Sequence, residues 1–205
     1  MKTFSKLLFL LVFVCLAAAC NQEDEMIQNE NLKKATIEPV TVTLPFKADL
    51  IGTYTGFIVP GDPDFTCDPS FECRVLVDAE GTATHMGKIT THFDFCACGP
   101  DNPDIPATDN KYGPANSVFV AANGDKLFVS CEGSVVTGRL PHHPQDVNSY
   151  WNDPFVITGG TGRFEGATGG GFTDDFNRDS YPANSFHHWT GTITLLKGKK
   201  ITFKY

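Results

Sequence analysis

The sequence has no excess of basic residues, and this absence excludes one large class of functions. Its 205 residues include 16 lysines and arginines against 24 aspartates and glutamates, for a formal net charge of -8. Non-specific binding of DNA or RNA requires a surplus of positive charge that can neutralise a row of phosphates. We therefore expect no nucleic-acid partner.

A complete phosphate-binding motif is also missing, although the glycine-rich segment 159–169 invites the comparison. A dinucleotide-binding fingerprint would need glycine where Glu165 stands, and a Walker loop would need lysine followed by serine or threonine. The segment leads into an expected strand, so it provides no helix N-terminus for a phosphate. We expect no nucleotide and no other cofactor.

Long hydrophobic runs are absent apart from residues 7–16. As a helix, these ten residues would span about 15 Å, half of the hydrocarbon core of a bilayer, so we expect no retained transmembrane helix. The run follows a short basic segment and precedes three alanines, which is the layout of a secretory signal peptide. We expect residues 1–19 to be removed on export.

Cys20 directly follows these three alanines, and the segment resembles a bacterial lipobox. The resemblance implies that Cys20 is lipidated on its thiol, becomes the N-terminus after cleavage and is acylated there. The sequence departs from the motif at Ala17, where leucine is commonest, with Leu16 one position early. Buried acyl chains contribute about 0.8 kcal/mol per CH2, so they would anchor the protein to a membrane. The alternative is an ordinary signal peptide in which Cys20 is incidental.

Residues 20–38 are mostly polar and show no periodicity, so we expect a flexible tether. The acidic run at 23–25 resembles the surface-export signal of lipoproteins from Bacteroidota, and the alternative is a plain solubilising linker. Together these features predict a protein of the cell envelope, lipid-anchored to the outer membrane on its periplasmic face or at the cell surface.

From residue 40 onward, apolar residues do not recur at the helical spacing i, i+3, i+4 and i+7. They alternate with polar residues between clusters of turn residues, which is typical of half-buried strands. The expected strands are 40–44, 51–59, 74–78, 82–95, 117–121, 127–135, 155–158, 164–176, 189–195 and 201–205. The pair Asn123-Gly124 predicts a tight hairpin, and residues 197–199 predict another turn.

So many consecutive half-buried strands favour an all-β, antiparallel barrel or sandwich with one apolar interior, formed by residues 39–205. Two long segments, 96–116 and 138–152, are rich in proline, asparagine and aspartate and are expected as loops. Loops of this length are uncommon without a function, so we expect them to form a rim or lid.

The run Gly160-Thr161-Gly162-Arg163-Phe164, followed by Gly166-Ala167-Thr168-Gly169, resembles a turn in allene oxide cyclases and dirigent-like barrels. Segment 81–88 is similar to one that recurs in secreted bacterial barrels of that kind. The resemblance covers about residues 48–196 and implies an eight-stranded, closed antiparallel β-barrel of the calycin or allene oxide cyclase kind, with a central cavity. No catalytic residue of the plant cyclases matches a position here, so it implies a fold and no active site.

Five cysteines remain beyond the signal peptide and Cys20, and in an exported protein they predict two disulfides with one thiol left over. These cysteines are Cys67, Cys73, Cys96, Cys98 and Cys131. We expect Cys67 to pair with Cys73 across a short loop, and Cys131 to pair with Cys96 or Cys98. A metal site built on Cys96 and Cys98 is the alternative, but its spacing matches no common zinc module, so we expect no metal.

The alternation places His85 and His187 on the apolar side of their strands, together with Trp189, and turns His92 and His188 to water. A polar spot of this kind inside a cavity could orient a ligand or act as acid and base. The expected ligand contacts are His85, Phe93, His187, Trp189 and Tyr54. The alternative is that these histidines are hydrogen-bonded core residues.

The pair His142-His143 lies between two prolines and is expected in an exposed loop. A catalytic triad or carboxylate pair cannot be located from spacing alone, because such partners meet only in three dimensions.

Three functions are compatible with the sequence. The first is a lipid-anchored barrel that binds a small apolar or amphipathic ligand. The second is an enzyme of the cyclase or isomerase kind that uses His85 or His187. The third is a structural or adhesion lipoprotein whose long loops form the contact surface.

Overall fold

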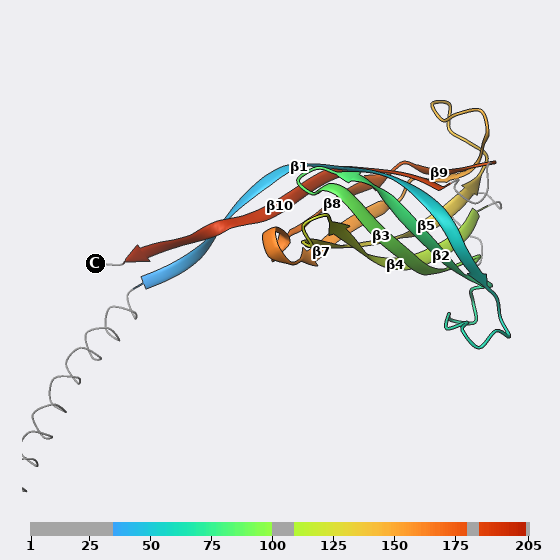
Figure 1. Ribbon diagram of the computed structural model, residues 1–205, viewed down its shortest axis with the longest axis horizontal. Coiled ribbons are helices and arrows are strands. Elements are labelled where there is room, and N and C mark those ends of the chain that lie inside the picture. Colours follow the sequence, from blue (N-terminus) through green and yellow to red (C-terminus); the bar gives the residue numbers. More distant parts are fainter. Residues whose placement is uncertain (1–34, 100–108, 180–184, 204–205) are drawn as a thin grey trace, which may run out of the picture. The chain divides into compact units, whose positions relative to one another are not determined.

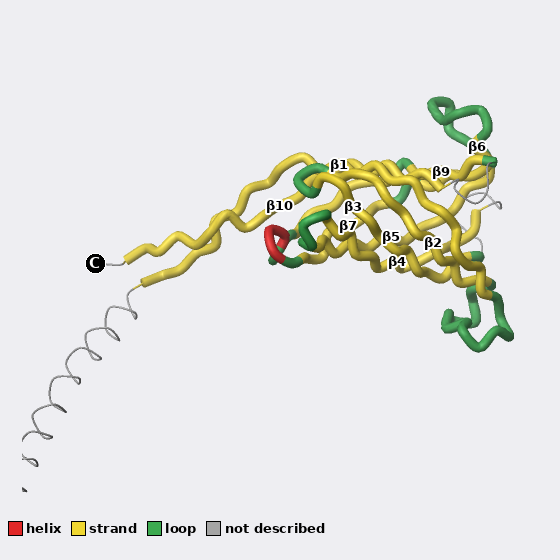
Figure 2. The backbone as a smooth tube through the Cα atoms, in the orientation of Figure 1, coloured by secondary structure: helices red, strands yellow, loops and turns green. Residues whose placement is uncertain are grey.

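The computed structural model describes residues 35–99, 109–179 and 185–203. The expected signal peptide and the expected lipidation site Cys20 lie outside the described residues, as do the first residues of the expected tether. The described chain consists mainly of strands (Figures 1 and 2). No helix among these residues is long and apolar enough to cross a membrane.

Ten strands and one short 3-10 helix make up the described fold. They are β1 (Ala35–Ile58), β2 (Cys73–Ala83), β3 (Gly87–Ala97), β4 (Asp109–Ala121), β5 (Lys126–Thr137), β6 (Val147–Trp151), β7 (Pro154–Gly160), η1 (Gly162–Phe164), β8 (Thr168–Thr173), β9 (Asp175–Arg178) and β10 (Ser185–Phe203). The start of β1 falls inside the segment expected as tether.

The strands form one sheet, in the order β1-β2-β3-β4-β5-β6-β9-β10-β8-β7, with antiparallel neighbours. Additional pairings join β1 to β10 and β5 to β7. Eight strands therefore pair in a ring: β1, β2, β3, β4, β5, β7, β8 and β10. The short strands β6 and β9 pair with each other and bridge β5 to β10. The predicted all-β, antiparallel class is confirmed.

The chain forms two units, residues 1–40 with 198–205 and residues 41–197. Of the first unit the structure describes residues 35–40 and 198–203, which belong to β1 and β10. The second unit contains the hydrophobic core and the cavity described below. Its largest fully buried side chains include Phe46, Leu50, Phe119, Leu127, Phe155, Phe164 and Ile193.

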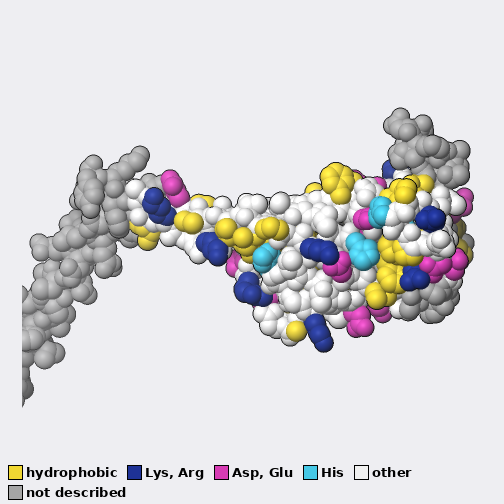
Figure 3. Space-filling model, turned by 90° about the horizontal axis from the view of Figure 1, so that it is seen from above, with side chains coloured by type: hydrophobic (Ala, Val, Ile, Leu, Met, Phe, Trp, Pro, Cys, Tyr) yellow, Lys and Arg dark blue, Asp and Glu magenta, His cyan; other side chains and the backbone are white. Residues whose placement is uncertain are grey.

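Burial alternates along the strands of the second unit, as the period of two predicts. In β3, for example, Ile89, Thr91 and Phe93 are buried whereas Lys88 and Thr90 are exposed. Some apolar side chains remain on the outer face, among them Ile51, Val156 and Phe172. In Figure 3, apolar side chains on one face are interspersed with basic and acidic ones.

The expected strand 82–95 is in fact two strands: residues 82–83 end β2, and residues 87–95 belong to β3. The chain turns at residues 84–86, where His85 has a φ of 66°, and Gly87 follows with a φ of 73°. Ala83 pairs directly with Gly87 across the hairpin. Because the turn contains three residues, inward positions stay odd-numbered on both sides of it, so the turn is invisible in the alternation.

Several strand boundaries were also predicted wrongly. Segment 40–44 and residues 51–58 of segment 51–59 belong to one strand, β1. Strand β10 continues through the expected turn at 197–199. Both expected long loops contain strand residues, from β3 and β4 in one case and from β6 in the other. In a single strand 164–176, alternation would put Phe172 on the same side as Phe164. Phe164 is buried but Phe172 is 58% exposed, because the turn around η1 shifts the alternation before β8.

The hairpin at Asn123-Gly124 is confirmed: Gly124 has a φ of 88° and donates its N–H to the Ala121 carbonyl at 2.9 Å. The glycine-rich turn packs beside it. Arg163 donates to the Asp125 carboxylate at 3.2 Å and to the His85 carbonyl at 2.9 Å, so one side chain ties three turns together. Neighbouring Phe164 is 1% exposed, as expected of a residue that plugs one end of the interior.

Two facing glycines, Gly171 in β8 and Gly191 in β10, permit a close approach of their strands. A Cβ atom added to Gly171 would overlap the Thr190 carbonyl oxygen, and one added to Gly191 would overlap the Gly170 carbonyl oxygen. The glycine run therefore serves backbone packing here.

Candidate functional site

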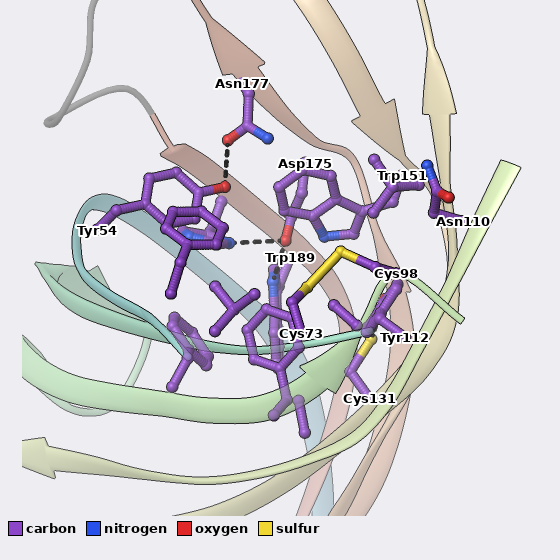
Figure 4. A pocket seen from close by; sticks show the side chains of 18 residues that line it. Tyr54, Cys73, Cys98, Asn110, Tyr112, Cys131, Trp151, Asp175, Asn177 and Trp189 are labelled. Atoms are coloured by element: carbon purple, nitrogen blue, oxygen red, sulfur yellow. Dashed lines mark hydrogen bonds and ion pairs between the residues drawn. A yellow bond between two sulfur atoms is a disulfide. The ribbon is translucent and has the colours of Figure 1, made fainter. Parts of the chain in front are cut away.

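The second unit contains a cavity of about 250 Å³ (Figure 4). Most of its wall is apolar, and seven of the lining side chains are aromatic. The lining residues are Tyr54, Phe57, Cys73, Val75, Phe93, Phe95, Ala97, Cys98, Asn110, Tyr112, Ala115, Cys131, Val135, Trp151, Asp175, Asn177, His187 and Trp189. They come from β1 to β6, β9, β10 and the residue that follows β3.

The main polar feature of this wall is the carboxylate of Asp175, which is 1% exposed. Its Oδ2 accepts hydrogen bonds from Trp189 Nε1 at 3.0 Å and from His187 Nδ1 at 2.9 Å. Its Oδ1 accepts the backbone N–H of His188 at 2.8 Å. Indole and backbone N–H groups can only donate, so this arrangement suits an ionised carboxylate. In Figure 4, dashed lines meet at this carboxylate, and a separate one joins Tyr54 to Asn177.

The imidazole of His187 is satisfied at both nitrogens. Nδ1 faces Asp175, and Nε2 lies 3.0 Å from the Ser185 hydroxyl. With Nδ1 donating, Nε2 can accept the hydroxyl proton, so a neutral ring completes both bonds. The ring also contacts Phe93 in a tilted arrangement and Trp151 in an edge-to-face arrangement, with centroids 4.9 and 5.8 Å apart.

The order Ser185, His187 and Asp175 reproduces the connectivity of a hydrolase triad, but the position of the serine differs from that of a nucleophile. Ser185 is 1% exposed and is not part of the cavity wall. A Cβ added to Gly52 would lie 3.2 Å from the Ser185 Cβ and 3.1 Å from His187 Nε2, so the β1 backbone covers this side. A substrate in the cavity therefore meets the ring of His187 and not the serine hydroxyl.

Two further polar points lie in the wall. The Tyr54 hydroxyl donates to Asn177 Oδ1 at 2.9 Å. The Tyr112 hydroxyl donates to Asp153 Oδ2 at 3.0 Å and lies 3.1 Å from Cys131 Sγ. Burial raises the pKa of the Tyr112 hydroxyl above its usual value and that of the Cys131 thiol to about 12. Both groups are therefore neutral at pH 7.

Four of the five expected contact residues lie in this wall: Tyr54, Phe93, His187 and Trp189. The fifth was placed wrongly. His85 is exposed in the turn between β2 and β3, where its Nε2 lies 2.9 Å from the Pro45 carbonyl oxygen. The expectation failed because the position was read as part of a strand, whereas a positive φ turns it away from the interior.

The sequence did not reveal Asp175, because alternation along a single strand 164–176 would turn it to the side opposite Phe164. The turn around η1 shifts the alternation, so Thr173 and Asp175 are buried whereas Phe172 is exposed. The backbone N–H of Asp174, between β8 and β9, bonds the His188 carbonyl. Asn177, Tyr112 and Cys131 were also missed as wall residues. A signal was available only for Tyr112, a single aromatic residue inside a segment expected to be a loop.

The disulfide pairing expected from the sequence was wrong. Cys67 pairs with Cys96 and Cys73 pairs with Cys98, while Cys131 is a buried free thiol. The register explains the exchange, because Cys73 lies opposite Ala97 at the end of the β2–β3 ladder and is therefore next to Cys98. Both cysteines of the expected metal alternative are thus held in disulfides.

The pair His142-His143 also differs from expectation, since the side chain of His143 is 1% exposed. Both imidazole Nε2 atoms contact the carboxylate of Asp174, at 2.8 and 3.0 Å. These three groups have ligand atoms within 4.8 Å of one another. However, His143 Nδ1 accepts the N–H of Leu140, so Nε2 carries the proton that bonds Asp174. These hydrogen bonds hold the loop before β6 against Asp174, the residue that precedes β9.

No family model matches the chain, and no curated protein matches it. Among solved structures, the chain is similar to a pterocarpan synthase dirigent protein, with 15% sequence identity and a TM-score of 0.42. The match covers 80% of this chain and 89% of that chain. A dirigent protein is thus a weak structural neighbour, and a likeness of this strength identifies neither ligand nor activity.

Proposed function

We propose that the ring of eight strands closes into a barrel and that its cavity binds a small apolar or amphipathic molecule. The observation that carries this proposal is the cavity of about 250 Å³, whose wall combines aromatic side chains with a few fixed polar atoms. Small-molecule sites in proteins have this composition, in which apolar area supplies affinity and a few polar groups orient the ligand. A barrel of eight strands leaves room for one small ligand.

The same proposal places the barrel on a lipid anchor in the outer membrane. Residues 1–19 act as the signal peptide, Cys20 carries the acyl chains, and residues between Cys20 and β1 connect the anchor to the barrel. Two disulfides support export, because such bonds persist mainly in oxidising compartments. The periplasmic and surface-exposed positions remain alternatives for the same anchor.

Intrinsic fluorescence provides a direct test of binding, because both tryptophans of the chain, Trp151 and Trp189, line the cavity. We expect 1-adamantanemethanol, a compact amphipathic probe that is transparent at the excitation wavelength, to change the tryptophan emission saturably. Filling the wall with Ala115→Phe should abolish this change, and the milder Ala115→Leu should weaken it.

The control for that titration is Ala122→Phe, which adds the same ring at an exposed position of the β4–β5 turn. This variant should bind the probe like the wild type. Binding that survives in a folded Ala115→Phe protein, or no saturable binding by any small amphipathic probe, would contradict the proposal.

A second candidate function is proton-transfer catalysis, such as cyclisation or isomerisation of a bound ligand. The observation that favours it is the pairing of His187 with a buried carboxylate in the wall of an apolar cavity. General acid–base chemistry there requires Nε2 to exchange the Ser185 hydroxyl for the substrate. On any substrate found by screening, His187→Gln should reduce turnover on the order of 100-fold or more. His188→Gln, which changes a neighbour outside the cavity wall, is the control, and equal turnover in both variants would exclude this function.

A further inference from the structure

Ionisable groups are scarce in the wall of the proposed ligand cavity. Among the described residues that line it, Asp175 is the only carboxylate, and none is lysine or arginine. Tyr112 and Cys131 could in principle carry negative charge, but burial raises the pKa of each well above 7. The described part of the wall therefore has one carboxyl group and no permanent positive charge.

The hydrogen bonds around Asp175 fix its charge in place without neutralising it. Its oxygens accept the backbone N–H of His188 and the indole N–H of Trp189. Neither of these two donor groups carries a charge that would offset the carboxylate. The third partner, His187, can make both of its bonds without a positive charge, with Nδ1 donating to Asp175 and Nε2 accepting from the Ser185 hydroxyl. The carboxylate thus contributes a net negative charge beneath an apolar surface, where fields are screened less than in water.

The aromatic side chains add a second effect of the same sign. The face of an aromatic ring is the negative end of its quadrupole and attracts cations, most strongly in tryptophan. The Trp189 indole donates to Asp175 at 3.0 Å, and the Trp151 ring contacts His187 with centroids 5.8 Å apart (Figure 4). An ammonium group can therefore contact ring faces while it lies within reach of the field of the carboxylate. An anion in the same place would be repelled by both.

The charge of the whole chain acts in the same direction. The formal net charge of -8 raises the local concentration of cations around the protein and lowers that of anions. This effect is weaker than that of Asp175 because salt screens it over about 10 Å.

We infer that the cavity selects organic cations: molecules with a compact apolar body and a primary or quaternary ammonium group. This inference rests on the proposed function, because it names the chemical class of the ligand bound in that cavity. The inference distinguishes organic cations from neutral and anionic molecules of the same shape. A purely apolar wall would bind all of these molecules equally well.

Three probes with one adamantyl body test the inference in the wild-type protein. They are 1-adamantanemethylamine, which is an ammonium ion at pH 7, the neutral 1-adamantanemethanol and the anionic 1-adamantanecarboxylate. From the strength of a partly desolvated cation–π contact, the amine should bind about tenfold more tightly than the alcohol, and the carboxylate should bind least. Equal affinity of the amine and the alcohol would overturn the inference and leave the proposed function standing. Binding of none of the three would overturn both.

The variant Asp175→Asn tests whether this carboxylate causes the preference for the amine probe. The variant should lose the tenfold preference for the amine while it binds the alcohol within a few-fold of the wild type. Glu165→Gln, which removes one negative charge from an exposed position in the glycine-rich turn, should keep the preference. A folded Asp175→Asn protein with unchanged preference would overturn the inference.

Because three N–H groups depend on the Asp175 carboxylate, the variant can fail to fold, so a second measurement uses the wild type alone. Raising the pH above the pKa of the amine probe makes that probe neutral. Its advantage over the alcohol should then disappear, while the N,N,N-trimethylammonium analogue, whose charge is permanent, keeps its affinity. An advantage that persists for the uncharged amine would contradict the inference.

Discussion

Removing both disulfides is expected to lower the free energy of unfolding by about 5 kcal/mol, because the unfolded chain regains the freedom that the two crosslinks deny it. Cys67–Cys96 and Cys73–Cys98 join residues 29 and 25 positions apart. Each alone would contribute about 3 kcal/mol, and the sum is smaller than twice that value because the two closed loops overlap. Urea unfolding of the oxidised protein and of the reduced, alkylated protein measures the difference.

A variant with serine at all four positions provides the control, since reductant should not change its unfolding midpoint. Peptide mapping of the oxidised protein should recover Cys67 linked to Cys96. Reduction that is complete by mass but leaves the midpoint of the wild-type protein unchanged would contradict the expectation, as would a Cys67–Cys73 linkage.

Trp189→Ala is expected to destabilise the protein by about 4 kcal/mol. The side chain is 2% exposed and packs against Phe155 and Phe119, with ring centroids 4.8 and 5.3 Å apart. Its removal leaves a void between these rings and also takes one N–H from Asp175, which stays buried with an unmet acceptor site. Thermal or urea unfolding measures the effect.

The second tryptophan of the chain offers a matched control. Trp151 is only half-buried and is the last residue of the short strand β6. Trp151→Ala should therefore lower the free energy of unfolding by about 1–2 kcal/mol. Trp189→Phe, which keeps an aromatic ring but removes the donor, should fall between the two alanine variants. Equal losses for the two alanine variants would show that Trp189 is not the centre of the core.

The fold class was predictable because most strands of the larger unit have one face in the interior and one in water. That asymmetry appears in the sequence as an alternation of apolar and polar residues, and it correctly placed Phe93, His187 and Trp189 inside. The turn at Asn123-Gly124 was predictable for a different reason, since its backbone angles demand those residue types.

Errors concentrate where a short turn interrupts the alternation without leaving a trace in it. A three-residue turn preserves the odd-even pattern, so His85 looked like an interior strand residue although its side chain is in water. At η1 the reverse occurs: the turn shifts the pattern, so Phe172 is exposed and Asp175 is buried against expectation. Hydrogen bonds to donors that follow it along the chain stabilise this burial, and alternation carries no information about them.

Contacts between residues that are distant in the sequence could not be predicted, for a different reason. Tyr54 and Asn177 are 123 positions apart in the chain, and the pairing of Cys73 with Cys98 depends on the register of one strand against the next. Register is set by the combined packing of the whole interior, so local patterns do not determine it. The residue types of the cavity wall could be anticipated, but their contacts could not.

The free thiol of Cys131 has a consequence for the chemical labelling of this chain. It is buried in β5, shares a hydrogen bond with Tyr112 and belongs to the cavity wall. A thiol with a pKa of about 12 reacts slowly even when it is reached, and a small reagent reaches it through the cavity that it lines. The alkylation rate of Cys131 therefore reports access to the cavity wall, and a bound ligand that covers the wall will slow the reaction.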